Sequence, residues 1–117
     1  MNAEYDTTIN DTFAMTIMIQ GILELVKQER GIEFDEESLH YERFVTHLKF
    51  LAQRLYRHEL LKDEEIEFAK LMENKYPGEY ECSKHIAEYI EKEYGGQISG
   101  EEIMFLAIHI KRVCMTD

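Results

Sequence analysis

The sequence predicts an all-α fold, a compact bundle of about five helices in a single domain. Apolar residues recur at helical spacing along the chain, and no sustained strand-like alternation is found. The chain has 117 residues, of which 44% are hydrophobic, enough for one compact core. One proline and six glycines leave little material for long loops, so we expect short connections between the helices.

The first two helices are predicted from apolar stripes with three- and four-residue steps. The first stripe comprises Met15, Met18, Ile19, Ile22 and Val26. Gly31 is a natural end for this helix, because glycine readily adopts the left-handed conformation that closes helices. The second stripe comprises Tyr41, Phe44, Leu48, Leu51 and Leu55. Either Asp35 or Ser38 can cap the start of this helix with a side-chain oxygen.

The other three helices carry stripes and end signals of their own. The third is expected to start at a cap on Asp63 and to end at Pro77-Gly78. Its stripe comprises Phe68, Leu71, Met72 and Tyr76. The fourth is expected to end at Gly95-Gly96. Its stripe comprises Cys82, Ile86, Tyr89 and Ile90. Ser99 and Glu102 form the S-x-x-E capping-box pattern ahead of the fifth helix. Its stripe comprises Ile103, Leu106, Ile110 and Val113.

The ends of the chain and its cysteines indicate the setting of the protein. Residues 1–10 are polar and acidic, and we expect them to be a linker remnant from an upstream domain, with the domain itself at 11–117. No stretch approaches the roughly 20 apolar residues that span a bilayer, and the N-terminus does not resemble a signal peptide. Cys82 and Cys114 are too few for a disulfide framework. We therefore expect a reducing, cytoplasmic setting without membrane contact.

The charge balance bears on the partners of the domain. There are 24 acidic and 13 basic residues, which give a net charge of −11. A domain that grips RNA or DNA needs cations to neutralise phosphates, so no direct nucleic-acid contact is expected. An acidic surface serves solubility or a basic protein partner equally well, and the charge alone does not choose between them.

Two histidines sit in matching local settings. Residues 44–49 read Phe-Val-Thr-His-Leu-Lys, and residues 106–111 read Leu-Ala-Ile-His-Ile-Lys. At about 100° per residue, each histidine lies roughly 60° to one side of the apolar stripe of its helix. We therefore expect His47 and His109 at the edge of a buried face, where packing holds the ring and a partner can still reach it.

Basic groups share these helix flanks. His40, Arg43 and Arg54 flank the first histidine, and Arg112 neighbours the second. An imidazole that is largely neutral at physiological pH suits reversible phosphoryl transfer, and the arginines can receive phosphate oxygens. The residues alone leave a second interpretation open, in which both histidines are packed structural groups and the arginines pair with acidic residues.

Two segments resemble a known family. RFVTHLKFLAQRL (43–55) and EEIMFLAIHIKRV (101–113) resemble the PTS regulation domain (PRD) of BglG/SacY-type transcriptional antiterminators, where PTS is the phosphoenolpyruvate-dependent sugar phosphotransferase system. The resemblance covers essentially the whole chain, with both motifs in the expected order and separation. First copies of the domain commonly have Asp before the first histidine, whereas Thr46 stands there. The chain therefore resembles the second of two such domains.

The resemblance implies a regulatory role. It implies a fold of about five helices that forms symmetric homodimers, and two phosphate-accepting histidines that map by motif onto His47 and His109. The implied donors are HPr and/or an enzyme II B component. Phosphorylation is then expected to control dimerisation, and thereby RNA binding by a separate N-terminal domain. The donor and the sign of regulation vary between family members.

Other function classes stay open at this point. A DNA-binding activator is an alternative parent protein for the same domain. A histidine phosphotransfer domain of two-component signalling is also an acidic helical bundle, although it relies on one exposed histidine. The sequence has no nucleophile–base pair, no glycine-rich phosphate loop and no metal-ligand spacing, so neither an enzyme, a cofactor nor a metal is expected. A helical dimerisation module with structural histidines is the plainest alternative.

Overall fold

The computed structural model describes residues 2–59 and 66–115, and for residues 2–10 and 66 it describes the backbone alone. Over this part of the chain all regular structure is helical, which confirms the predicted all-α fold. The helices are α1 (Asn2–Arg30), α2 (Leu39–Arg57), α3 (Ile66–Lys75), α4 (Pro77–Tyr94) and α5 (Gly100–Cys114). None of them, over the described residues, has the length and apolar character of a membrane span.

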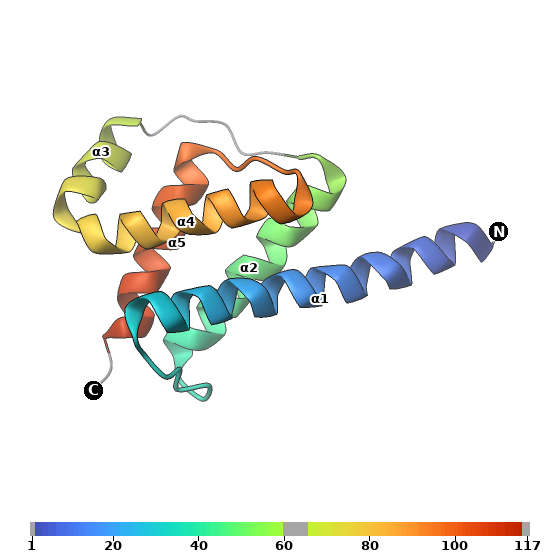
Figure 1. Cartoon of the computed structure of the whole chain (residues 1–117), viewed down its shortest axis with the longest axis horizontal. Helices are drawn as coiled ribbons and strands as arrows, with labels where there is room; N and C mark the ends of the chain where they lie inside the picture. The colour runs from blue at the N-terminus through green and yellow to red at the C-terminus, as the bar shows by residue number, and fades with distance from the viewer. Residues whose placement is uncertain (1, 60–65, 116–117) are drawn as a thin grey trace.

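Four of the helices form two pairs that cross each other (Figure 1). α1 packs against α4, and α2 packs against α5. Contacts of α1 with α2 and of α4 with α5 close the bundle around a shared core. The short α3 packs on α4 and α5, while the N-terminal part of α1 extends beyond the other helices (Figure 1). The seam between α2 and α5 brings together the two segments that carry the motif histidines.

The predicted stripes of α1, α2, α4 and α5 meet in one core. Its buried members include Met18, Ile22 and Val26 of α1, Phe44, Leu48 and Leu51 of α2, Cys82, Ile86 and Ile90 of α4, and Leu106, Ile110 and Val113 of α5. Full burial of a side chain of this size stabilises a fold by about 1.5–3 kcal/mol. The core therefore sets the rotation of each helix, and with it the direction in which the flanking histidines point.

Most of the predicted helix ends are confirmed. Ser38 and Ser99 are the N-cap residues of α2 and α5, and the Oγ of each accepts a hydrogen bond of 3.1 Å from the backbone N–H three residues later. Ser38, and not Asp35, is thus the cap of α2. Gly31 and Gly95 follow the last residues of α1 and α4 with φ angles of 64° and 75°, the left-handed region that glycine tolerates.

The prediction for the third helix was wrong in two respects. α3 ends at Lys75, and Pro77 does not merely end it but is the first residue of α4, where its missing N–H is not needed. Tyr76 is the N-cap of α4 and so lies outside α3. Phe68 and Leu71 are 45% and 60% exposed, because this ten-residue helix packs by another face. The inward side chains of α3 are Ala69 and Met72.

Two predictions concern residues that the structure describes in part or not at all. The cap on Asp63 lies outside the described residues. The division into a linker at 1–10 and a domain at 11–117 stays a prediction. The backbone of residues 2–10 is helical and continues α1 without a break.

Candidate functional site

The two motif histidines lie against each other. The ring of His47 on α2 and the ring of His109 on α5 have centroids 4.9 Å apart, with their planes tilted by 42°. The sequence predicted matching positions on two separate helices, and packing of α2 against α5 turns those positions into one site. Both residues are partly buried, and the side chain of His47 is 19% exposed, in agreement with the predicted edge positions.

Phenylalanine rings hold each imidazole from the side. The ring of Phe44 stacks on His109 at 5.9 Å between centroids, and the ring of Phe105 lies 6.1 Å from His47 at a tilt of 58°. Phe44 is fully buried in the core, so the ring of His109 is tied to the packing of the whole bundle. Such ring contacts restrict both imidazoles without using their nitrogens.

Glu102 lies next to the two rings and was not predicted as a site residue. Its side chain is almost fully buried. The Nε of Arg54 donates a hydrogen bond of 2.8 Å to its Oε2, and the Nη2 of Arg54 donates to the same oxygen. Its other oxygen, Oε1, lies 3.4 Å from Nε2 of His47. The carboxylate therefore joins α2 to α5 through two partners on α2.

A sequence signal for Glu102 existed, but it was ambiguous. Glu102 precedes His109 by seven residues, which places both on one flank of α5. The capping-box pattern predicted instead that this carboxylate accepts a hydrogen bond from the backbone N–H of Ser99 at the helix start. In the structure the backbone N–H of Glu102 does bond to Ser99, while the side chain points inward to Arg54.

The surroundings shift the pKa of Glu102 downward. Burial alone would raise the pKa of this carboxyl group. The contacts with His47 and Arg54 outweigh burial and hold the pKa below its ordinary value. Glu102 is therefore a carboxylate throughout the physiological pH range, and the site contains one fixed negative charge.

The surroundings of His109 keep its imidazole neutral. Burial lowers the pKa of His109, and the nearby basic side chains of His47, Arg112, Arg43 and His40 lower it further, to about 4. A neutral imidazole has a free nitrogen lone pair, which is the nucleophilic form.

The predicted basic neighbours divide into three groups. Arg43 lines an open pocket of about 270 Å³ together with Glu42, Thr46, His47, Phe50 and His109. His40 and Arg112 line a separate pocket of about 550 Å³ between the start of α2 and the end of α5. Arg54 forms an ion pair with Glu102. Pairing of the arginines with acidic residues was the second interpretation that the sequence allowed. A role in holding phosphate stays a prediction for all four residues.

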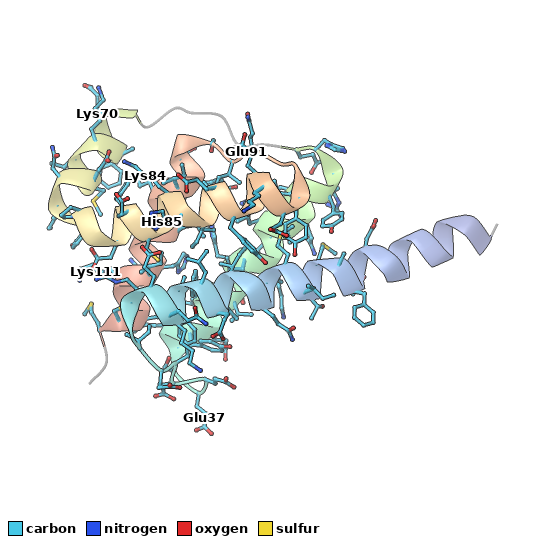
Figure 2. All side chains as sticks on the ribbon, viewed as in Figure 1. Glu37, Lys70, Lys84, His85, Glu91 and Lys111 are labelled. Atoms are coloured by element: carbon cyan, nitrogen blue, oxygen red, sulfur yellow. The ribbon has the colours of Figure 1, made fainter. Side chains whose placement is uncertain are left out.

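One further histidine has a defined environment outside this site. His85, labelled in Figure 2, lies on α4 at the side that faces α1. Its Nδ1 is 2.8 Å from Oε1 of Glu29 on α1, and its Nε2 is 3.3 Å from Oε2 of Glu81. The hydrogen bond to Glu29, with the charges around it, raises the pKa of His85. This contact ties α1 to α4 on the surface.

The described residues form no metal-ligand cluster. Over 2–59 and 66–115, no three or more His, Cys, Asp or Glu side chains are grouped to hold an ion. Both cysteines are free thiols, Cys82 within the core and Cys114 at its edge.

Comparison with known proteins gives one family and several relatives. A family profile described as "PRD domain" matches residues 20–113. "Transcription antiterminator LicT" of Bacillus subtilis (strain 168) is 43% identical over 113 residues, covering 97% of this chain and 41% of that protein. "Beta-glucoside operon antiterminator" of Dickeya chrysanthemi is 37% identical over 113 residues, covering 97% and 40%. "Protein GlcT" of Staphylococcus aureus (strain JH9) is 30% identical over 105 residues, covering 90% and 37%. The chain thus spans about two fifths of the length of these relatives.

Proposed function

This chain belongs to the PRD domain family, and on that premise we propose that it is the second regulatory domain of a bacterial transcriptional antiterminator, controlled by phosphorylation of His47 and His109. The names of two relatives, a transcription antiterminator and an operon antiterminator, support the regulatory role. The domain itself is the receiver of phosphate and not the enzyme, because the donor protein brings the reactive phosphoryl group.

The observation that carries the proposal is the contact between the two motif histidines at an open pocket. His47 and His109 lie 62 positions apart in the chain, and the centroids of their rings are 4.9 Å apart. Both rings line the pocket that Arg43 also lines. A phosphate on either ring would enter a space bordered by a guanidinium group, which binds phosphate oxygens through charge-assisted hydrogen bonds.

The proposed donors are HPr and/or an enzyme II B component. The domain carries a net charge of −11, yet Arg43, Arg112 and His40 all contribute positive potential at His109. A local positive field on an acidic domain favours the approach of a phosphoryl group at this one place. The phosphorylated side chain of the donor then needs to reach only the open pocket, without unfolding the core.

Phosphorylation would change the packing of α2 against α5 and the packing of two copies of the domain in a homodimer. A phosphate adds roughly −1.5 to −2 charges beside the seam of α2 and α5, next to the exposed Phe50. Such a charge changes the relative stability of two packings of a homodimer by a few kcal/mol, which is enough to switch the population. RNA binding belongs to a separate N-terminal domain, because an acidic domain repels nucleic acid.

Phosphate mapping tests the proposal directly. The domain is incubated with phosphorylated HPr and, separately, with a phosphorylated enzyme II B component, and labelled histidines are located by mass spectrometry under alkaline conditions. We expect label on His47 and His109. His47→Ala and His109→Ala should each remove one site.

His85→Ala is the matched control, since His85 is a partly exposed histidine outside the pocket. It should leave the amount of label unchanged. A phosphorylated response regulator serves as the control donor, because it would label a histidine phosphotransfer domain. The proposal is refuted by a domain that takes no phosphate from HPr or enzyme II B, or that takes it only from the response regulator.

A further inference from the structure

We propose that Glu102 is a positioning residue that keeps the ring proton of His47 on Nε2, so that Nδ1 of His47 is the nitrogen that accepts the phosphate. This inference rests on the proposed function and adds to it the identity of the reacting atom. It also assigns a role to a buried carboxylate that the histidine motifs do not include.

A buried oxygen of Glu102 and a buried nitrogen of His47 face each other. Oε1 of Glu102 and Nε2 of His47 lie 3.4 Å apart, at the distance of an ion pair, and neither atom forms a hydrogen bond of normal geometry with any described residue. A carboxylate oxygen only accepts hydrogen bonds, so the ring nitrogen that faces it must be the donor. The opposite tautomer would place a lone pair against a buried negative charge. Among the described residues, only a proton on Nε2 makes the contact between these two buried atoms attractive.

Glu102 is held so that it cannot turn away from His47. Arg54 donates two hydrogen bonds to Oε2, which leaves Oε1 directed at the imidazole. Arg54 lies seven residues after His47 on the same face of α2, so one helix supplies both partners of the carboxylate. The backbone N–H of Glu102 is bonded to the cap residue Ser99, which fixes the start of α5.

The second nitrogen of His47 is the accessible one. Nε2 is among the buried polar atoms, whereas Nδ1 is not among them and forms no hydrogen bond to the described residues. The side chain of His47 is 19% exposed and lines the open pocket together with Arg43. With the proton on Nε2, the lone pair of the neutral ring is on Nδ1, which is the atom free to react.

Phosphoryl transfer to Nδ1 of His47 then needs no movement of the proton on Nε2. The Nδ1 lone pair of His47 forms the new N–P bond as the bond between phosphorus and the donor side chain breaks. The electron pair of the broken bond stays on the donor atom. The phosphorylated ring of His47 retains its Nε2 proton and carries a positive charge, which the adjacent carboxylate of Glu102 stabilises, as carboxylates do for histidines in other sites.

His109 provides an internal comparison. It has no ion pair or hydrogen bond to a carboxylate among the described residues, and the charges that act on it are those of His47, Arg112, Arg43 and His40. Glu102 therefore controls the tautomer of His47 and leaves that of His109 to other contacts.

The first test reads the ring nitrogens of the unphosphorylated domain. Long-range ¹H–¹⁵N correlation spectra at about pH 8, where histidines are mostly neutral, distinguish a protonated ring nitrogen from an unprotonated one. We expect His47 to be entirely in the form with the proton on Nε2. A proton on Nδ1 overturns the inference whether or not the domain is ever phosphorylated, so the two proposals fail separately.

The second test locates the phosphate after reaction with phosphorylated HPr. A ³¹P–¹⁵N correlation should place it on Nδ1 of His47, although Nε2 is the less crowded nitrogen of an unconstrained histidine. Attachment to Nε2 in the wild-type domain overturns the inference.

Variants show whether Glu102 is the cause. The double variant Glu102→Leu, Arg54→Met removes the charged pair together and keeps apolar volume in its place. It should give a mixture of both His47 tautomers and a phosphate that moves at least partly to Nε2. Glu42→Gln removes a carboxylate that lines the same pocket and should change neither readout. If the double variant keeps the wild-type tautomer and the wild-type phosphate position, Glu102 has no positioning role.

Discussion

Arg54 of α2 and Glu102 of α5 form a largely buried ion pair next to the two histidines, with their side chains 23% and 2% exposed. Residues 48 positions apart in the chain are joined by two hydrogen bonds from one guanidinium group. This pair and the histidine rings are neighbours on the same seam, so the stability of the seam and its chemistry are linked.

Because Arg54 and Glu102 form an ion pair, replacing one of them should lower the free energy of unfolding more than replacing both. Arg54→Met should destabilise the domain by about 3 kcal/mol, because it leaves a carboxylate buried with only His47 near it. Adding Glu102→Leu should restore most of that loss, since an apolar pair needs no charge compensation. Urea unfolding of both variants and the wild type measures this. A double variant less stable than Arg54→Met would show that the pair matters for packing rather than for charge.

The closeness of His47 and His109 predicts that their phosphates interfere. Two phosphate dianions on rings 4.9 Å apart repel each other strongly, even with Arg43 nearby. We expect the second phosphate to add at least about tenfold more slowly than the first, which corresponds to only about 1.4 kcal/mol of repulsion. Intact-mass kinetics separates the singly and doubly labelled species. Equal rates for the two steps would mean that the rings move apart on phosphorylation.

The fold was predictable from the sequence where the signal is local. The stripes of α1, α2, α4 and α5 and the glycine ends at Gly31 and Gly95 depend on spacing and backbone preference within one helix. α3 was predicted less well, because a ten-residue helix has too few turns for its apolar pattern to select one face, and Phe68 and Leu71 remain exposed.

The candidate site was predictable only in its parts. The flank positions of His47 and His109 follow from helical geometry, but their contact depends on how α2 packs on α5. The direction of the Glu102 side chain depends on Arg54, which lies in another helix. A local capping pattern places this carboxylate at the helix start and cannot report a partner 48 residues away.

His109 should make the domain lose stability on the acid side. Its pKa is about 4 in the folded domain and about 6.5 in an unfolded chain. Between these values the unfolded chain binds more protons, so the free energy of unfolding falls as pH falls from about 6.5 towards 4, by about 2 kcal/mol at pH 5. His109→Phe keeps an aromatic ring against Phe44 and should flatten this slope. Parallel slopes for the two proteins between pH 7 and pH 5 would contradict the lowered pKa.

His85 should make the domain lose stability as pH rises, which is the opposite of the effect of His109. Its pKa is raised in the folded domain by the hydrogen bond to Glu29. The stabilisation is therefore fully present below about pH 6.5 and is lost as pH rises through the raised folded pKa. The difference in unfolding free energy between wild type and His85→Gln should shrink from pH 6 to pH 9. Glu29→Gln should behave in the same way, because it removes the partner of the same contact. A difference that grows with pH would show that the imidazole is not protonated in the folded domain.

Gly21 should resist replacement by alanine although it lies inside a helix. In a helix interior, alanine normally stabilises the helix by about 1 kcal/mol relative to glycine. A Cβ on Gly21 would lie only 2.0 Å from the hydroxyl of Tyr89 and 2.8 Å from its Cζ, so the ring of Tyr89 must move. That ring packs against the core and against Tyr94, which limits its movement. We therefore expect Gly21→Ala to destabilise the domain by about 1–3 kcal/mol, as overpacking does. Tyr89→Phe removes the closest atom and should recover part of the loss in the double variant, measured as a coupling energy in a double-mutant cycle. A stabilised Gly21→Ala protein would mean that α1 and α4 can separate at this point without cost.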